Sequence, residues 1–535
     1  MDREVYDAIV IGAGHNGMAL STYLGKSGWR VLVLERRYEE GGGLTTEHYT
    51  QAGFLHNLHS NYHTFVGLCP VYDDLELIGG GDGVSYGHPP VQMGSIFSDG
   101  TALTIHTDMK KTHASMSRFS SKDADTFGRL YKEVKGFQDL MIKTLMYAPP
   151  IELNDITKAL SKWKVEEKTE FFRVQNRMLS INDFLNKHFD NEKVKTALAF
   201  HAAVCGYYTD VPGLAVSFPF MVGKIDNWKI CIGGSHRLAH SLWRQMRRNN
   251  VLLLPASPVS EILMKDGRAS GVRLTDGREF FAEKLVASSV DLEQTFRKML
   301  PPGTVAEQTL KEVDDFEYQD GSLFSVHLAL DKVPTYKAAA FDPDINRAWV
   351  LNLGYDCLED FNDDWKAIRA GKAPVAPKLN AAFNSMFDPT DAPEGKATGL
   401  LRVFAPHAVD GKGSGVWSTG FKDVYARRCV EKLLEYCDDF GEGEILQARP
   451  YTPLDTSEKL VNMVKGDWMV GKITPSNLLA DRPSKALSQY RTPVEGLYLC
   501  GSCTHPHGFI TFGPAYNALQ VIADDFGMDK WWEEI

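Results

Sequence analysis

The sequence predicts an α/β fold of more than one domain, and three observations lead to this prediction. The chain has 535 residues, more than a single hydrophobic core usually accommodates. Its first segment follows the order strand, glycine-rich turn, helix and strand, which is typical of a Rossmann-type parallel sheet. Further along the chain, helical patterns alternate with short apolar strands, as expected for a second, mixed α+β domain.

A complete dinucleotide-binding motif opens the chain. An apolar strand over residues 6–11 runs directly into G-A-G-H-N-G at residues 12–17, which satisfies G-x-G-x-x-G. Gly12 permits the tight turn out of the strand, Gly14 lets the backbone approach a pyrophosphate, and Gly17 lets the helix pack closely on the strand. The free N–H groups and the partial positive charge at the helix start favour phosphate binding.

The second strand, over residues 30–34, ends at Glu35, whose carboxylate suits the hydroxyl pair of an adenosine ribose. An acid here disfavours the 2′-phosphate of NADP. A second glycine cluster at residues 41–43 is typical of FAD enzymes of the glutathione-reductase type, in which such a loop meets the pyrophosphate and the flavin. Because no second G-x-G-x-x-G follows a strand and opens a helix, we expect one tightly held FAD and no separate NAD(P)H domain.

Composition argues against several other classes. A net charge of −11 and a pI near 5.8 make a nucleic-acid partner unexpected. No stretch approaches the ~20 apolar residues of a membrane span, and the first strand begins too close to Met1 for a signal peptide. Eight cysteines without a disulfide spacing favour the reducing cytoplasm. The C-x-x-C at Cys500 and Cys503 leaves a redox dithiol open beside a packing role.

The expected second domain is built from helices and strands in the middle of the chain. Long helices are predicted over residues 120–146 and 181–205, where apolar residues recur every three or four positions. Their apolar faces also suit the entry of a hydrophobic substrate, which leaves a peripheral membrane contact open. Further predicted strands cover residues 259–264, 269–274, 279–281, 285–289, 322–330, 348–353 and 400–405.

The last part of the chain resembles a known family. A strand ends in Gly501 and Ser502, T-H-P follows at residues 504–506, and G-P-A-Y-N-A at residues 513–518 opens a terminal helix. This pattern is similar to the phytoene desaturase-like FAD oxidoreductases, which include carotenoid desaturases and carotenoid isomerases. Three other stretches agree with the resemblance, at residues 12–43, 233–289 and 388–396.

The resemblance implies where FAD would bind. The glycines of the first motif would meet its pyrophosphate, Glu35 the adenosine ribose, and Val259 the adenine through its backbone. The terminal helix, starting at Pro514, would direct its N-terminus at the N1–C2=O edge of the flavin. The full set of implied FAD-binding residues is Gly12, Ala13, Gly14, Asn16, Gly17, Glu35, Arg36, Gly42, Gly43, Val259, Gly501, Ser502, Gly513, Pro514 and Asn517.

Two departures from the family pattern fall beside the expected flavin face. H-G-F-I-T-F at residues 507–512 is bulkier than the usual glycine-rich run, and H-N-L-H at residues 56–59 replaces the usual Asp-x-Gly. Both departures favour a smaller or more polar substrate over a long polyene.

The predicted function is that of an FAD-dependent oxidoreductase, with hydride transfer between flavin N5 and a small or medium hydrophobic organic substrate. His59 and His505 are the candidate catalytic bases, because a neutral imidazole accepts a proton near pH 7, although each can instead pack against or hydrogen-bond the ring. Two alternatives stay open: a flavin-assisted double-bond isomerase without net redox, and a non-catalytic interaction protein stabilised by FAD. No metal site is predicted, and the electron acceptor and the oligomeric state stay open.

The FAD-binding pieces lie at both ends and in the middle of the sequence, so a discontinuous domain is predicted. It gathers residues 1–105, 225–300 and 445–535. Residues 106–224 and 301–444 form the expected substrate domain.

Overall fold

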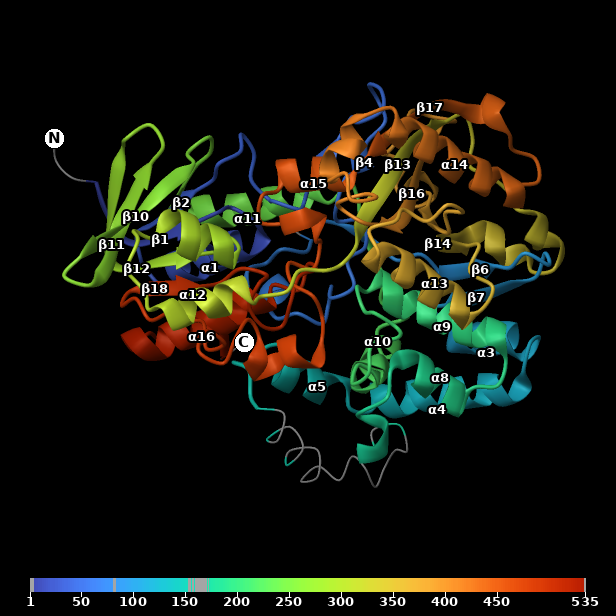
Figure 1. Cartoon of the computed structure of the whole chain (residues 1–535), viewed down its shortest axis with the longest axis horizontal. Coiled ribbons are helices and arrows are strands. Elements are labelled where there is room, and N and C mark those ends of the chain that lie inside the picture. The colour runs from blue at the N-terminus through green and yellow to red at the C-terminus, as the bar shows by residue number, and fades with distance from the viewer. Residues whose placement is uncertain are drawn as a thin grey trace.

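Two seven-stranded sheets, one in each lobe, organise the computed structural model (Figure 1). The structure describes residues 4–79, 83–152, 155, 158, 171 and 173–533. The first three residues, which we expect to lead straight into the first strand, lie outside the described residues. Shorter elements are β3 (Thr46–Glu47), β4 (His56–Asn57), β5 (Tyr86–Gly87), β8 (Ile230–Cys231), α2 (Val71–Asp74), α10 (Phe218–Val222) and α15 (Pro453–Lys459).

The strands of the first sheet are β1 (Val5–Ile11), β2 (Val31–Leu34), β9 (Val251–Leu254), β10 (Val259–Lys265), β11 (Arg268–Leu274), β12 (Glu279–Ser288) and β18 (Leu497–Leu499). β1 pairs in parallel with β2 and with β12, β2 pairs in parallel with β9, and the end of β12 pairs in parallel with β18. β10, β11 and the start of β12 form an antiparallel meander. The predicted α/β class with a Rossmann-like βαβ unit is therefore confirmed.

Side chains of β1 alternate between two buried faces of the first sheet. Val10 packs against the helices of one face, whereas Ile11 belongs to the core on the other. Burial on both faces explains why this strand reads as a continuous apolar run. The covering helices are α1 (His15–Lys26), α11 (His236–Arg248) and α16 (Gly513–Phe526) on one face, and η3 (Glu293–Met299) and α12 (Glu307–Asp314) on the other.

The strands of the second sheet are, in spatial order, β17 (Ile445–Tyr451), β13 (Ser322–Leu330), β16 (Ala397–Ala405), β15 (Leu379–Ala382), β14 (Ala348–Leu353), β6 (Val91–Ile96) and β7 (Ala102–His106). Neighbours are antiparallel except for β14 and β6, which run in parallel. The helices of this lobe are α3 (Met109–Ser117), α4 (Ser121–Lys135), α8 (Ile181–His188), α9 (Glu192–Val204) and α13 (Leu358–Arg369) in one core, and α14 (Phe421–Tyr436) in the other.

Four predicted elements differ in the structure. The long helix expected over residues 120–146 is divided into α4 and α5 (Gln138–Leu145) at Gly136 and Phe137. The helix expected over 181–205 is likewise two helices, because the Asn191 side chain accepts hydrogen bonds from the first backbone N–H groups of α9 and so starts a new helix. The strands expected over 279–281 and 285–289 form one continuous strand, β12.

Strand pairing moves two of the predicted domain boundaries. β6 and β7 pair within the second sheet, next to β14. The first nucleotide-binding segment therefore ends before β6, and not at residue 105 as expected. β17 also belongs to the second sheet, so the last nucleotide-binding segment begins after residue 451 rather than at 445. The rest of the division stays a prediction. In the described ranges, no helix combines the length and the apolar character needed to cross a bilayer.

Candidate functional site

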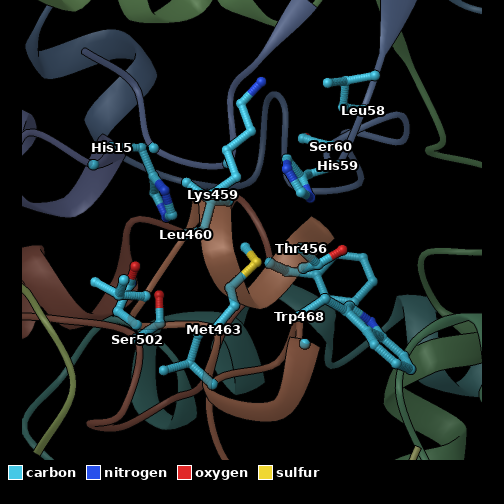
Figure 2. Close-up of a pocket in the computed structure, with 18 of the residues that line it drawn as sticks. His15, Leu58, His59, Ser60, Thr456, Lys459, Leu460, Met463, Trp468 and Ser502 are labelled. Atoms are coloured by element: carbon cyan, nitrogen blue, oxygen red, sulfur yellow. The ribbon is translucent and has the colours of Figure 1, made fainter. Parts of the chain in front are cut away.

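A cavity with a volume of about 380 Å³ lies between the two sheets. The carboxyl ends of β1 and β2 line one end, and strands of the second sheet line the other. Figure 2 shows His15 and Ser502 on one side, His59 and Ser60 on another, and Met463 between them. The carboxyl edge of parallel strands is where α/β folds bind their ligands, so this cavity is the candidate site.

Two glycine loops face each other at the nucleotide end of the cavity. An added Cβ at Gly14 would meet no atom within 4 Å, so the backbone there is open to the cavity. Opposite it, a Cβ at Gly42 would lie 3.1 Å from the Gly14 Cα, and Gly43 also lines the cavity. The Gly41 N–H donates to the Ala13 carbonyl oxygen at 2.7 Å and holds the loops together. No side chain separates the two loops, an arrangement that fits a dinucleotide pyrophosphate.

Two other motif glycines make close backbone contacts. Gly12 lines the cavity with a φ of +93°, and an added Cβ would lie 2.7 Å from Ser289 Oγ. Gly17 lies away from the cavity, where a Cβ would approach the Gly12 carbonyl oxygen to 2.1 Å. Gly17 therefore serves the close packing of α1 on the turn, as its motif position predicts.

Glu35 lies buried at the cavity wall and organises the turn. Its Oε2 accepts a hydrogen bond from the Ala13 N–H at 2.9 Å, and its Oε1 accepts one from the Arg37 N–H at 2.9 Å. Each carboxylate oxygen keeps a further lone pair for a ribose hydroxyl. Arg36 also lines the cavity and donates to the carbonyl oxygens of Glu458 and Lys459.

The remaining predicted cofactor residues divide into two groups. Asn16, Ser502 and Val259 line the cavity, and the Asn16 Nδ2 donates to Ser502 Oγ at 3.1 Å. The Asn16 Oδ1 has no hydrogen-bond partner among the described residues. Gly501 lies behind the cavity wall, where an added Cβ would come within 2.5 Å of the Ser289 carbonyl oxygen.

The start of α16 does not reach the cavity, contrary to the sequence-based expectation. Gly513, Pro514 and Asn517 are buried but absent from the cavity lining. The Asn517 Nδ2 donates to the Met146 carbonyl oxygen at 3.0 Å, and a Cβ on Gly513 would touch Pro506. The end of α5 and the turn before α16 therefore cover the helix N-terminus that was expected to face the flavin.

Only one of the two candidate bases lines the cavity. His59 does so, with its Nε2 3.2 Å from the Tyr451 hydroxyl, and burial together with the positive charges of Lys459 and Arg402 lowers its pKa to about 3. His505 is buried away from the lining, where its ring faces the backbone of Leu145 at the end of α5. Burial lowers the pKa of His505 to about 3 as well.

His15 is a cavity residue that the sequence analysis did not single out. It lines the cavity, burial lowers its pKa to about 4, and its Nε2 has no hydrogen-bond partner in the described structure. Its position inside the glycine motif, directly after Gly14, was the available signal.

A row of polar residues across the second sheet was also missed. Asn380, Arg402 and Ser325 pair in register on β15, β16 and β13, and all three line the cavity. The Arg402 Nη2 donates to the His59 carbonyl oxygen at 2.7 Å, whereas its Nε has no partner in the described chain. The signal was the arginine itself, which interrupts an apolar strand.

The charges that line the cavity are strongly unequal. Among the described residues of the lining, Glu35 is the single acid, against Arg36, Arg37, Lys378, Arg402 and Lys459. Most of these cations have partners outside the lining: Lys378 pairs with Asp364 at 2.8 Å, Arg37 with Glu39, and Lys459 with Glu47. Arg402 is buried and forms no ion pair among the described residues.

The C-x-x-C pair does not form a reactive site. Cys500 and Cys503 are both buried free thiols, and neither lines the cavity. Burial raises the pKa of Cys503 to about 12, which keeps the thiol protonated. The geometry therefore favours the packing role.

Comparisons with known proteins agree with this architecture. A family model described as an NAD(P)-binding Rossmann-like domain matches residues 10–70. A variant of putrescine oxidase of known structure superposes with a TM-score of 0.61 at 16% identity, covering 98% of this chain and 99% of that one, which shows the shared fold. Phytoene desaturase (neurosporene-forming) of Rhodobacter capsulatus is 25% identical over 97% of this chain and 94% of its own.

A further relative decides the family. One of the subunits of limonene dehydrogenase from Castellaniella defragrans is 30% identical, and the alignment covers 99% of this chain and 96% of that protein. The alignment therefore includes the two facing glycine loops at residues 12–17 and 41–43, called the glycine cradle below, as well as the second sheet. The chain belongs to the phytoene desaturase-like family of FAD-dependent oxidoreductases.

Proposed function

We propose that this protein is a dehydrogenase that oxidises a small or medium hydrophobic substrate with a carboxylate at one end. One observation supports this most directly: a single cavity joins the glycine cradle to an apolar wall that contains Arg402. Among the described residues that line the cavity, Arg402 is the one buried cation, and it forms no ion pair with a described residue. Bound FAD supplies the acceptor for a hydride from the substrate.

Backbone geometry supports FAD binding at the nucleotide end of the cavity. Gly12 and Gly14, with the first N–H groups of α1, hold the pyrophosphate, and Glu35 accepts hydrogen bonds from the ribose hydroxyls. Gly42 and Gly43 close over the pyrophosphate because no Cβ obstructs them. We assign this part to the glutathione-reductase class, as a domain assembled from three segments of the chain.

The substrate end excludes water from the reacting bond. Its apolar wall combines residues of α9, the second sheet and the segments before and after β18, namely Phe200, Val204, Leu323, Phe404, Trp468 and Phe509. Burying an apolar body against such a wall contributes roughly 25 cal/mol per Å² of surface removed from water. A hydrocarbon or isoprenoid skeleton of moderate size suits this wall.

The polar row gives the substrate its orientation. The Asn380 Oδ1 accepts a hydrogen bond from the Tyr62 hydroxyl at 3.0 Å, while its Nδ2 has no partner in the described structure. Arg402 is its direct cross-strand neighbour, and the Nε of Arg402 has no hydrogen-bond acceptor among the described residues. Since a buried charge is costly without a counter-charge, a substrate carboxylate bound here would compensate both groups.

His59 is the residue we assign to proton transfer. Its lowered pKa leaves the imidazole neutral at pH 7, so that one ring nitrogen can accept a proton. The Tyr451 hydroxyl is within hydrogen-bond distance of the Nε2 and orients the ring. His505 has no part in this proposal because it does not line the cavity.

The function is tested first by the flavin itself. The purified protein should release FAD on denaturation, and its bound flavin should bleach under anaerobic conditions with a hydrophobic substrate. Turnover should consume an electron acceptor in proportion to product. Product formed without any acceptor consumed would instead identify a double-bond isomerase, and a flavin that no metabolite reduces would favour a non-catalytic protein.

The carboxylate anchor is tested separately with octanoate, octanol and octylamine, which share a chain and differ in the head group. Octanoate should perturb the absorption spectrum of the bound flavin at lower concentration than octanol or octylamine do. Arg402→Met should remove the preference. Arg449→Met is the matched control, because Arg449 also donates to a loop carbonyl from the second sheet but lies outside the cavity. Equal binding of all three probes would overturn the anchor and leave the flavin assignment intact.

A further inference from the structure

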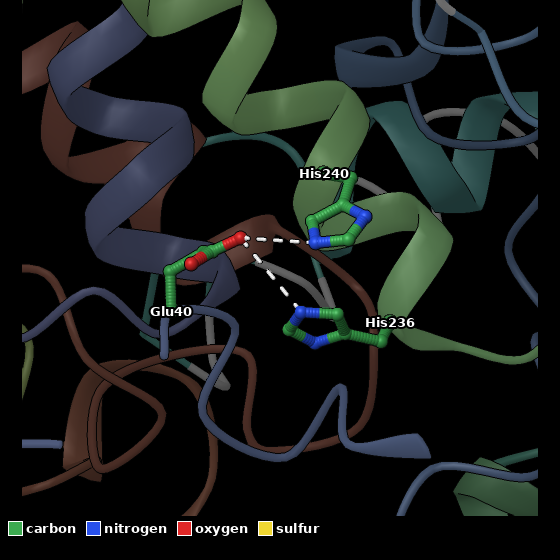
Figure 3. Close-up of side chains that lie close together, drawn as sticks. All are labelled: Glu40, His236 and His240. Atoms are coloured by element: carbon green, nitrogen blue, oxygen red, sulfur yellow. Dashed lines mark ion pairs between the residues drawn. The ribbon is translucent and has the colours of Figure 1, made fainter. Parts of the chain in front are cut away.

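Three potential metal ligands converge beside the glycine cradle. His236 begins α11 and His240 lies one turn later, so both side chains project from the same face of the helix. Glu40 comes from the loop that follows β2. Figure 3 shows both imidazoles directed at the Glu40 carboxylate, with the His236 and His240 Nε2 atoms 3.8 and 3.6 Å from the Glu40 Oε1.

The tautomer of His236 follows from its other ring nitrogen. The Nδ1 lies 2.8 Å from the Leu44 carbonyl oxygen, which can only accept a hydrogen bond, so this nitrogen carries a proton. In the neutral ring the Nε2 then presents a lone pair toward Glu40. A hydrogen bond from one ring nitrogen to a backbone carbonyl is also how metal-binding histidines are usually oriented.

The Glu40 carboxylate has no hydrogen-bond donor among the described residues. In the described structure, no hydrogen bond to either of its carboxylate oxygens is formed, and both imidazoles lie within 4 Å of its Oε1. Its side chain is only 15% exposed, and that of His236 is 16% exposed. A positive charge between this shielded carboxylate and the lone pair of the His236 Nε2 would stabilise both groups.

We propose that Glu40, His236 and His240 bind a divalent transition-metal ion of the zinc type. The His236 and His240 Nε2 atoms lie 3.8 and 3.6 Å from the Glu40 Oε1, slightly beyond the ~3.3–3.5 Å expected between ligand atoms of a tetrahedral zinc site, and one ligand atom from each residue lies within 4.8 Å of the others. Two histidines spaced i, i+4 on a helix are an established zinc-binding arrangement. Three protein ligands leave one coordination position for water, which His240 permits because its side chain is 45% exposed.

Such an ion would fasten the second glycine loop to α11. Glu40 directly precedes Gly41, where an added Cβ would lie only 2.7 Å from the Ala239 Cβ of that helix. The next two glycines line the nucleotide end of the cavity. The ion therefore holds this loop in its FAD-binding position, a consequence that rests on the proposed cofactor site.

The test begins with protein that keeps its flavin and is stripped of metal by a chelator. Titration with Zn²⁺, followed by calorimetry and elemental analysis, should show one ion per chain. Co²⁺ should add visible bands in a difference spectrum against the metal-free protein. His240→Ala should weaken Zn²⁺ binding by more than about 100-fold, since even the loss of a supporting residue costs 10- to 100-fold.

The matched control is His113→Ala. His113 also lies beside a carboxylate, with its Nε2 2.8 Å from Asp125, but no second histidine of the described chain joins the pair. This variant should bind Zn²⁺ as the unchanged protein does. Glu40→Gln, which keeps the shape of the side chain, should lose the ion like His240→Ala and serves if the alanine variant does not fold.

Three results would overturn the site: no stoichiometric ion, equal affinity in His240→Ala and the unchanged protein, or equal losses in His240→Ala and His113→Ala. Flavin retention provides the second measurement. Metal-free protein should release FAD faster on dilution, and Zn²⁺ should restore the slower rate. Because metal binding and flavin content are measured independently, failure of the metal site is distinct from failure of the FAD assignment.

Discussion

Gly14 and Gly42 meet backbone to backbone, and a Cβ added at Gly42 would lie 3.1 Å from the Gly14 Cα. This contact brings together two glycine loops from the start of the chain and leaves the space beside them free of side chains. The nucleotide end of the cavity is therefore shaped by the absence of Cβ atoms, which makes it sensitive to small substitutions.

Gly14→Val should abolish FAD retention. The valine side chain would project into the cradle, where the pyrophosphate is expected to approach the backbone, although no protein atom lies within 4 Å. Flavin absorbance per protein, measured after gel filtration, gives the result. Gly415→Val is the control, since a Cβ there also meets no atom within 4 Å and Gly415 lies outside the cavity. A yellow Gly14→Val protein would contradict the assignment.

His59→Ala should leave FAD bound but slow the reduction of the flavin by substrate by about 10²–10⁴-fold, the usual contribution of a general base. Because burial lowers its pKa to about 3, the rate in the unchanged protein should vary little between about pH 5 and 8. Stopped-flow absorbance measures both effects. His505→Ala should retain the rate, since His505 does not line the cavity. Comparable losses in both variants would point to a structural cause.

The cofactor end was largely predictable from sequence, and the substrate end was not. Gly12 to Gly17 and Glu35 act within one short stretch, so their spacing carries the geometry. Arg402 and Asn380 are separated in sequence and meet only through the pairing of β15 with β16. Pairing of this kind depends on strand order, which sequence periodicity does not encode.

The same limit explains the misplaced elements. β6 joins the second sheet through a parallel pair with β14, more than 250 residues later, so residues 91–105 were placed in the wrong domain. The family pattern around His505 suggested a flavin contact, yet residues 145–147 fold over that region from a distant helix. Local motifs identify the chemistry of a segment, whereas tertiary packing decides which side chains reach the cavity.

Acid should destabilise the fold below about pH 6.5 through its buried histidines. Histidines with burial-lowered pKa values bind protons more readily in the unfolded chain, so their contribution is present above pH ~6.5 and is lost as the pH falls toward their folded values. Aspartates whose pKa burial raises, such as Asp391 with a pKa of about 8, have the opposite effect: they stabilise the fold as the pH falls. The histidines concerned include His15, His56, His59, His63, His201, His505 and His507.

The midpoint of thermal unfolding should therefore fall between pH 7 and 5 at constant ionic strength. His505→Gln should reduce the slope of the unfolding free energy against pH by up to ~1.4 kcal/mol per pH unit, because at most one fewer proton is taken up on unfolding. His113→Gln is the control, because His113 is exposed. An unfolding midpoint that stays constant or rises on acidification would show that the aspartates dominate.

Arg402→Met should separate stability from binding. Removing the guanidinium relieves a buried charge that has no ion pair among the described residues, and burial already lowers its pKa, whereas the lost hydrogen bond to the His59 carbonyl oxygen costs about 1 kcal/mol. The unfolding midpoint without ligand should therefore stay equal or rise. Octanoate at 100 times the dissociation constant should add ~2.7 kcal/mol to the unfolding free energy of the unchanged protein and so raise its midpoint, but it should leave Arg402→Met unaffected. Arg449→Met should respond to octanoate as the unchanged protein does. If Arg402→Met unfolds much more easily and still gains stability from octanoate, the arginine supports the sheet and the carboxylate binds elsewhere.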